Sequence, residues 1–219
     1  QSMQDVRNHF ALGRGKLDIA AMPTYTTNFL PKILAEFHSQ YPNIHITVHD
    51  VIAENVMQMV REERSELGIT FAPEDAPDLH FQPLYQDRFV AILPLNHPLL
   101  EQQTLKWIDL LAYPHLSLQR PAGTRKLIDQ ALQEKGLLLT PAFESHQLVS
   151  IGRMVNEGLG LSVVPSTSRA QMEEMGLQCR AISAPVITHQ VGIVTRPQQA
   201  LSAAALAMQQ LIRAAVGKP

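Results

Sequence analysis

The sequence predicts an α/β fold in which strands and helices alternate and the sheets are largely parallel. Short apolar runs typical of strands recur along the chain, and between them apolar residues return at helical spacing. This alternation is typical of sheets covered by helices. With 219 residues, the chain can bury a sizeable core and form one large domain or two small ones.

The composition excludes several classes of protein. Hydrophobic residues make up 45% of the chain and charged residues 17%, as in an ordinary soluble globular protein. The formal net charge of −2 gives no general attraction to nucleic acid or membranes. A single cysteine, Cys179, rules out an internal disulfide and favours a reducing compartment. No run approaches the roughly 20 apolar residues of a membrane helix, and no signal-peptide core is present, so we expect a cytoplasmic protein.

The N-terminal segment indicates the end of a connecting helix followed by a hinge. Val6 and Phe10 lie one helical turn apart, and Gly13 and Gly15 follow on either side of Arg14. We therefore expect a further segment before residue 1 in the intact protein.

The first strong pattern is a strand, a tight turn and a helix. The apolar run 17–22 predicts a strand that Pro23 ends. Thr24 and the threonines after it supply hydroxyls that can cap a helix, which we expect from about Thr26 to Tyr41 with a distortion before Pro31. Such a turn places free backbone amides at the carboxyl end of a strand, where open α/β sheets bind ligands.

The next strand, Ile44–Val48, has one apolar and one polar face because its apolar residues alternate with polar ones. His45 and His49 share the polar face, about 13 Å apart along the strand. That separation is too large for both to bind one metal ion, so we expect them at an edge or an interface.

The rest of the chain continues the alternation. The expected strands are 67–73, 79–84, 89–95, 115–119, 141–145, 161–165, 178–184 and 187–195, and the expected helices are 56–60, 105–111, 124–136, 145–158, 166–175 and 199–216. The uninterrupted apolar run 89–95 suits a strand buried on both faces. Thr124 is the predicted N-cap of its helix, and Gly136 ends that helix.

The sequence offers little for catalysis or metal binding. The nine histidines are scattered, and neither a cysteine pair nor a helical His-x3-His motif occurs. Ser162 lacks the flanking glycines of a nucleophile elbow, and Cys179 has no evident partner. Gly158 and Gly160 lie between a helix and a strand, the wrong order for a dinucleotide fingerprint. We expect no metal, no cofactor and no enzymatic activity, and no basic stripe suggests nucleic-acid binding.

Three predicted helix starts favour an anionic ligand. They are Thr24–Thr26, Gly123–Thr124 and Ser145–Gln147, and each combines free backbone amides with the partial positive charge of a helix N-terminus. Arg120 and Arg125 flank the second start, and we expect both to face solvent. No acid–base pair accompanies these starts, so the pattern indicates a binding cleft.

Several motifs in a fixed order resemble one protein family. They are LDIAAMPT, LPKILAEFHSQYPNIHITV, VREERSELGITF, PLYQDRFVAILPLNHPL, RPAGTRKLID and MVNEGLGLSVVP. Through them the chain resembles the effector-binding domain of LysR-type transcriptional regulators from about Gly15 to Arg196.

This resemblance implies the fold of type 2 periplasmic binding proteins: two Rossmann-like lobes joined by two crossing strands, with the effector between them. Lobe I would comprise 14–87 plus 188–217, and lobe II 88–187. Residues 1–13 would be the end of the linker helix and a hinge. The C-terminal helix would pack on lobe I.

The resemblance also implies the residues that contact the effector. Those of lobe I are Thr24, Tyr25, Phe71 and Ala72, and those of lobe II are Gln119, Gly123, Thr124, Gln147, Val164 and Pro165. Some relatives carry an arginine near Ala72, and this chain has none.

The implied partners are a small-molecule effector, expected to be an organic anion, and a second copy of the chain. The helix Phe29–Tyr41 and the strand Ile44–Val48 would pack against lobe II of that copy in an antiparallel dimer, and the full-length protein would form a tetramer. DNA would bind only through a winged helix-turn-helix domain before residue 1, and we expect no membrane contact.

Two other functions share this scaffold. One is a solute-binding protein of a transport system, and the other is an enzyme built on the same lobes. Codons upstream of residue 1 would distinguish regulator from transport protein, because they would encode either a helix-turn-helix or a signal peptide. An enzyme would need a catalytic pair in the cleft, and the sequence shows none.

Overall fold

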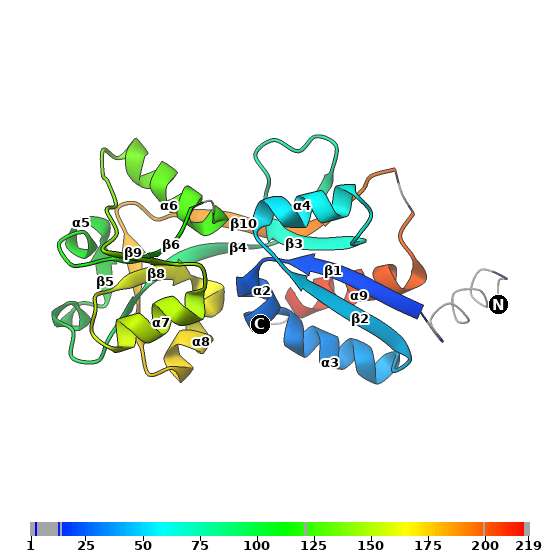
Figure 1. Ribbon diagram of the computed structural model, residues 1–219, viewed down its shortest axis with the longest axis horizontal. Helices are drawn as coiled ribbons and strands as arrows, with labels where there is room; N and C mark the ends of the chain where they lie inside the picture. The colour runs from blue at the N-terminus through cyan, green and yellow to red at the C-terminus, as the bar shows by residue number, and fades with distance from the viewer. Residues whose placement is uncertain (1–2, 4–12, 14, 121, 199, 217–219) are drawn as a thin grey trace. The chain divides into compact units, whose positions relative to one another are not determined.

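The structure is a computed structural model that describes residues 3, 13, 15–120, 122–198 and 200–216, and it divides into two compact units (Figure 1). Unit 1 comprises the chain up to Gln86 and from Gln190 onward, and unit 2 runs from Asp87 to His189. The chain passes between the units within β4 (His80–Leu93) and within β10 (Thr188–Thr195). Apart from Met3 and Gly13, the predicted linker helix and hinge fall outside the described residues.

Unit 1 is built on a sheet with the strand order β2, β1, β3, β10 and the first part of β4. β1 (Gly15–Ala21) pairs in parallel with β2 (Ile44–Asp50) on one side and β3 (Leu67–Phe71) on the other, and β10 runs antiparallel to β3. Every residue of β3 is buried, as its apolar sequence predicts for a strand covered on both faces. β2 lies at the edge of the sheet.

The helices of unit 1 are α2 (Pro23–Asn28), α3 (Leu30–Gln40), α4 (Ala53–Arg61) and α9 (Ala203–Val216). α9 packs against α3 and β1, and α4 packs on β3 and β1. Ile33 and Phe37 of α3 are buried one turn apart, as are Met208 and Ile212 of α9. The C-terminal helix thus packs on β1 and α3 of unit 1.

The predicted helix from Thr26 to Tyr41 is in fact two helices. α2 ends at Asn28, and Phe29 separates it from α3. Pro23 and Pro31 each lie in a first turn, where the amide proton that proline lacks would have no partner inside the helix. The break before Pro31 is therefore the start of a new helix.

The predicted threonine cap of the first helix is wrong. The N-cap of α2 is Met22, whose side chain carries no capping oxygen. Thr26 lies inside the helix, and its hydroxyl donates to the carbonyl of Met22 at 3.3 Å.

Unit 2 contains a mixed sheet and a separate strand pair. The second part of β4 pairs antiparallel with β8 (Ser162–Pro165) and β9 (Gln178–Ser183), and β5 (Thr104–Lys106) pairs in parallel with β9. β6 (Leu116–Leu118) and β7 (Phe143–Ser145) form a two-stranded parallel sheet. The prediction of largely parallel sheets is therefore wrong for β4. An apolar run indicates that a strand is buried on both faces, but it does not indicate whether the strand pairs in parallel or antiparallel with its neighbours.

The helices of unit 2 are α5 (Trp107–Leu110), α6 (Gly123–Glu134), α7 (Leu148–Asn156) and α8 (Arg169–Glu174), and the 3-10 turns are η1 (Pro98–Glu101) and η2 (Ser166–Ser168). Successive residues of β4 alternate between two apolar clusters. Phe89, Ala91 and Leu93 pack in the cluster that contains Trp107. Val90 and Ile92 pack in the cluster that contains Ile151 and Val164. This two-sided burial explains the uninterrupted apolar run.

Within the parts of the chain that the structure describes, no helix is long and apolar enough to cross a membrane.

Candidate functional site

The predicted ligand residues of unit 1 lie where β1 and β3 end. The amide of Met22, just after β1, donates to the carbonyl of Ile69 in β3 at 3.2 Å and holds the two strand ends together. Because parallel neighbours end at the same edge of a sheet, the segments that follow them leave the sheet side by side. The structure thus brings four predicted residues to one edge: Thr24, Tyr25, Phe71 and Ala72.

Tyr25 and Phe71 pack beneath this edge. Both side chains are buried, and their rings meet edge to face with centroids 6.0 Å apart and an interplanar angle of 87°. Such a contact contributes about 0.5–1.5 kcal/mol beyond area burial. It braces α2 against β3. Thr24 is also buried, whereas Ala72 is exposed and its amide donates to the carbonyl of Gln190 at 2.9 Å.

The two histidines on the polar face of β2 contact polar side chains within unit 1. The Nε2 atom of His49 lies 2.8 Å from Oδ1 of Asp18 in β1. His45 lies on the same face, and its Nε2 atom is 3.4 Å from the hydroxyl of Thr47. Among the described residues, no group of three or more His, Cys, Asp or Glu side chains is arranged to hold a metal ion.

In unit 2, the predicted ligand residues cluster at the ends of β6 and β7. The amide of Gln119, just after β6, donates to the carbonyl of Ser145 at the end of β7 at 3.0 Å. The amide of Ala122 then donates to the carbonyl of Gln119 at 3.0 Å, which turns the chain into α6. Gln147 is exposed between β7 and α7. The structure therefore brings four predicted residues to one end of this strand pair: Gln119, Gly123, Thr124 and Gln147.

Thr124 does not cap its helix, contrary to the prediction. α6 begins at Gly123, and its N-cap is Ala122, whose carbonyl accepts from the amide of Lys126 at 3.1 Å. Thr124 lies in the first turn with its side chain buried. The sequence favoured Thr124 because threonine is a preferred cap, but the chain enters the helix two residues earlier. α7, by contrast, begins later than expected, at Leu148.

The sequence analysis was wrong about the exposure of Arg125, which lies next to the predicted ligand residue Thr124. We expected Arg120 and Arg125 to face solvent. Arg120 does, with 70% of its side chain exposed, but Arg125 is only 4% exposed. The signal for burial was present in the sequence, because Arg125 shares one face of α6 with the buried residues Ile128 and Leu132.

Two carboxylates surround the buried guanidinium. Arg125 donates to Asp129, one turn further along α6, at 3.0 Å and to Glu144 of β7 at 2.9 Å. Burial acts to lower the pKa of Arg125, but the hydrogen bonds to Glu144 and Asp129 outweigh it and raise the pKa above its usual value. Arg125 therefore stays charged, and its charge is already balanced within the protein.

Val164 and Pro165 end β8, opposite Val90 and Phe89 of β4. Both side chains are buried. They can therefore offer a ligand little besides backbone atoms.

A buried carboxylate that the sequence analysis did not identify lies at the start of unit 2. Asp87 accepts from the amide of Arg88 at 2.8 Å, and from the hydroxyl and the amide of Thr167 at 2.6 and 3.3 Å. The Nε2 atom of His189 lies 3.8 Å from Asp87, and its ring packs on Phe89 with centroids 5.1 Å apart. Burial lowers the pKa of His189 to about 4, against the attraction of Asp87. The sequence around Asp87 does not indicate the contact with Thr167, because the two residues are 80 positions apart.

The ten predicted ligand residues supply hydrogen-bonding groups. None of the ten carries a carboxylate, a thiol or an imidazole. Threonine hydroxyls, glutamine amides and backbone amides can hydrogen-bond a small polar molecule at several points.

Solved structures with the same fold include effector-binding domains. The effector-binding domain of QuiR, in complex with shikimate, has a TM-score of 0.81 at 19% identity, covering 92% of this chain and 96% of that chain. The regulatory domain of CcmR from Synechocystis, in complex with 2-PG, has a TM-score of 0.83 at 21% identity, covering 93% and 98%. At these identities the likeness shows the fold, and it confirms the predicted type 2 periplasmic-binding-protein class.

Curated relatives share more of the sequence. The uncharacterised HTH-type transcriptional regulator YbhD of Escherichia coli is 29% identical over 205 residues, which cover 94% of this chain and 65% of that protein. The transcriptional activator protein LysR of Escherichia coli is 28% identical over 190 residues, which cover 86% of this chain and 61% of that protein. This chain therefore spans less than two thirds of the length of these relatives.

The family model of the LysR substrate binding domain matches residues 11–217. Because that match covers almost the whole sequence, the chain belongs to the LysR substrate-binding domain family, the effector-binding part of LysR-type transcriptional regulators.

Proposed function

We propose that this domain binds a small organic anion through the ten predicted residues and passes the signal to transcription without catalysing a reaction. The observation that carries this proposal is the grouping of hydroxyl and amide donors at strand ends in each unit, with no carboxylate, thiol or imidazole among the ten residues. The ligands of the two solved relatives, shikimate and 2-PG, support a small oxygen-rich molecule.

We also propose that units 1 and 2 are the two lobes of the family, 14–87 plus 188–217 and 88–187. The limits of the units, after Gln86 and after His189, support this assignment because they fall within a few residues of the expected crossings. Each unit contributes its own part of the ligand-binding set.

Replacing Thr24 with alanine is expected to weaken ligand binding by about tenfold or more while leaving the fold intact. A hydrogen bond to a charged oxygen contributes about 1.5–3 kcal/mol, and about 1.4 kcal/mol is a factor of ten. Gln147→Ala tests unit 2 in the same way. A thermal-shift screen of small organic acids and phosphate esters, starting with shikimate and 2-PG, identifies a ligand, and calorimetric titration measures Kd.

The matched control is Thr27→Ala, because Thr27 is exposed in the same short helix as Thr24. It should bind like the wild type. Affinity that is unchanged in both Thr24→Ala and Gln147→Ala would mean that the ligand binds elsewhere.

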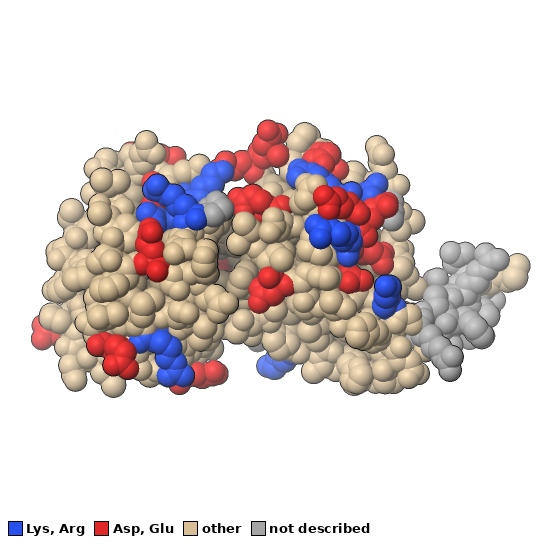
Figure 2. Space-filling view, viewed as in Figure 1, with Lys and Arg blue, Asp and Glu red and all other residues tan. Residues whose placement is uncertain are grey.

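We propose that the intact protein binds DNA through a segment before residue 1 and works in the cytoplasm, where a DNA-binding regulator acts. The relatives named as transcriptional regulators extend beyond the matched region, which supports such a segment. On the face that Figure 2 shows, Lys and Arg are interspersed with Asp and Glu. We therefore expect this fragment to give no gel shift at physiological salt, and tight, salt-sensitive binding would contradict the proposal.

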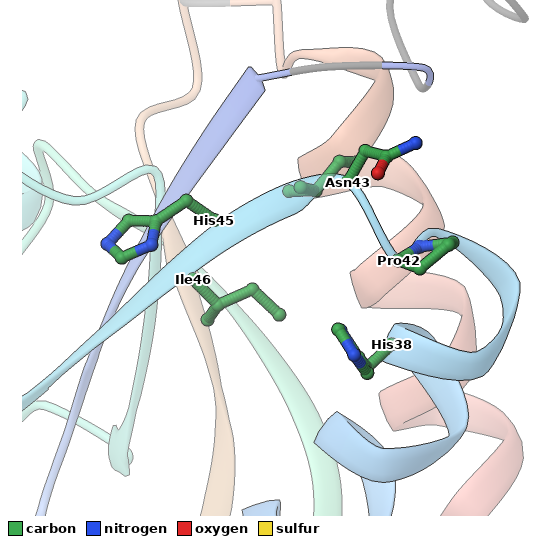
Figure 3. Close-up of a pocket in the computed structure, with 6 residues that line it drawn as sticks. His38, Pro42, Asn43, His45 and Ile46 are labelled. Atoms are coloured by element: carbon green, nitrogen blue, oxygen red, sulfur yellow. The ribbon is translucent and has the colours of Figure 1, made fainter.

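We propose that α3 and β2 form an antiparallel dimer contact with unit 2 of a second copy, and that the full-length protein is a tetramer. β2 is an edge strand, and an exposed edge invites pairing. A surface hollow opens where α3 ends and β2 begins, and Ile46 points toward α3 there (Figure 3). Its lining residues are His38, Pro42, Asn43, Ile44, His45 and Ile46.

Sedimentation of the wild type at about 10 µM should show a dimer, because specific protein interfaces commonly have a Kd below that concentration. Ile46→Lys should shift it to monomer, because a buried lysine without a partner is costly in an interface. Asn55→Lys, at an exposed position of α4, serves as the control and should stay dimeric. A wild-type protein that sediments only as monomer would refute this contact.

A further inference from the structure

One buried guanidinium joins three segments of unit 2. Arg125 lies in the first turn of α6, and its Nε atom donates to Asp129 on the same helix at 3.0–3.1 Å. Its Nη1 atom donates to Glu144 of β7 at 2.9 Å and to the carbonyl of Leu118 in β6 at 3.3 Å. The same nitrogen lies 3.4 Å from the hydroxyl of Ser117 in β6.

Each of these segments leads directly to a residue assigned to the ligand. Leu118 immediately precedes Gln119, and Glu144 lies just before the turn that carries Gln147. On α6, Arg125 itself immediately follows Thr124. A shift of the guanidinium would therefore move all three groups of ligand residues relative to one another.

The geometry points to a positioning role for Arg125: we propose that its guanidinium sets the spacing of the β6 end, the β7 end and the α6 start, and so shapes the ligand-binding surface of unit 2. This inference rests on the proposed function. The planar guanidinium donates in several fixed directions, whereas a lysine ammonium is a compact point charge on a flexible stem. Positive charge alone therefore does not reproduce the role.

Arg125 fixes the positions of its acceptors, because it is less exposed than either carboxylate. Glu144 is 45% exposed and Asp129 is 23% exposed, so water can replace part of what Arg125 offers them. Arg125 is 4% exposed and depends on these acceptors, because an unpaired buried charge is strongly unfavourable. The segments are thus held around the guanidinium.

Arg120 provides a matched control. It donates to the same carboxylate, Asp129, at 2.8 Å, but 70% of its side chain is exposed. That carboxylate lies on α6, outside β6 and β7. Arg120→Lys therefore changes a guanidinium beside Asp129 while leaving Arg125 and its contacts with Glu144 and Leu118 in place.

The first experiment measures hydrogen exchange of the Gln119 amide, which donates to Ser145 across the β6 and β7 ends. The reference is the Leu116 amide at the other end of β6, which donates to the carbonyl of Leu161 at 2.9 Å. Relative to that reference, Arg125→Lys should speed exchange at Gln119 by at least about tenfold. Arg120→Lys should leave the ratio within about twofold.

Glu144→Gln is the second variant, because it keeps the acceptor oxygen and removes only the charge that Arg125 faces on β7. Glu144→Gln should also speed exchange of the Gln119 amide, by a smaller factor than Arg125→Lys. If Arg125→Lys does not fold, Glu144→Gln alone tests the proposal. Equal acceleration at Gln119 and Leu116 in either variant would make Arg125 a general stabiliser, and the proposal would be overturned.

The second experiment measures binding of shikimate and 2-PG. For a probe that the wild type binds, Arg125→Lys should raise Kd by about tenfold and Arg120→Lys should leave it unchanged, since about 1.4 kcal/mol is a factor of ten. Unchanged Kd in Arg125→Lys would contradict the positioning role. If the wild type binds neither probe, the proposed function loses support for these ligands, and the exchange ratio still decides the role of Arg125.

Discussion

Replacing Gly160 with alanine is expected to destabilise the protein by about 3–5 kcal/mol, the range reached by backbone strain and overpacking together. Gly160 has a φ of +155°, and a Cβ atom there would lie 2.2 Å from the carbonyl oxygen of Pro114. That oxygen also accepts from the amide of Leu161 at 3.0 Å. The new methyl group would therefore push apart the contact that connects β8 to the start of β6.

Gly158→Ala is the matched control in the same turn. Gly158 has a φ of +83°, and among the described atoms nothing lies within 4 Å of a Cβ built there. Its substitution should cost only the strain of a left-handed alanine, about 1–2 kcal/mol. Urea unfolding of both variants measures the difference. Equal losses of free energy would show that the backbone relaxes around the methyl group added at position 160 and that the close approach to Pro114 is not required.

Stability is expected to fall by about 2 kcal/mol between about pH 7.5 and about pH 5 because of His115 alone. Burial, with a further contribution from the charge of Arg125, lowers the pKa of His115 to about 4. The unfolded side chain binds a proton below about pH 6.5, whereas the folded one does so only below about pH 4. Across that window the unfolded state binds more protons, so stability is full above it and is lost as the pH falls.

Urea unfolding of wild type and His115→Gln at the two pH values checks this expectation. Glutamine is close to histidine in volume and does not titrate, so the variant should lose about 2 kcal/mol less than the wild type on acidification. It should still lose some stability, because His189 has a pKa lowered in the same direction. His80→Gln, at an exposed position, is the control and should follow the wild type. Equal pH dependence in all three proteins would show that His115 is not buried in its neutral form.

Much of the fold follows from patterns among neighbouring residues. The apolar run that forms the second part of β4 is buried on both faces, as predicted, and the run that forms β3 is buried throughout. Pro31 marks a helix start because proline lacks only an amide proton that a first turn leaves unpaired. These features depend on local backbone chemistry and on the apolar character of adjacent side chains, and both are visible in the amino-acid order.

The candidate site was predictable only in part, because a strand end can be located from sequence but its packing cannot. Thr24 does lie just after a strand, as its position in the pattern predicts, whereas Gln119, the last residue of the predicted strand 115–119, lies directly after β6. The same pattern could not show that Tyr25 packs on Phe71, because β1 and β3 become neighbours only in the folded sheet. It also predicted Thr124 as the N-cap of α6, whereas the N-cap is Ala122, two residues earlier.

The long-range partners of the buried charges were decided by the tertiary structure. Glu144 is 19 residues from Arg125, and Thr167 is 80 residues from Asp87. A charged side chain leaves water only where a folded neighbour supplies a compensating charge or hydrogen bond. Sequence spacing shows that Arg125 lies on the apolar face of its helix, one turn before Asp129, but it cannot show that Glu144 and the carbonyl of Leu118 also accept from it. The amino-acid order therefore accounts for the elements and their apolar faces, whereas the polar contacts that arrange the site arise from segments the fold brings together.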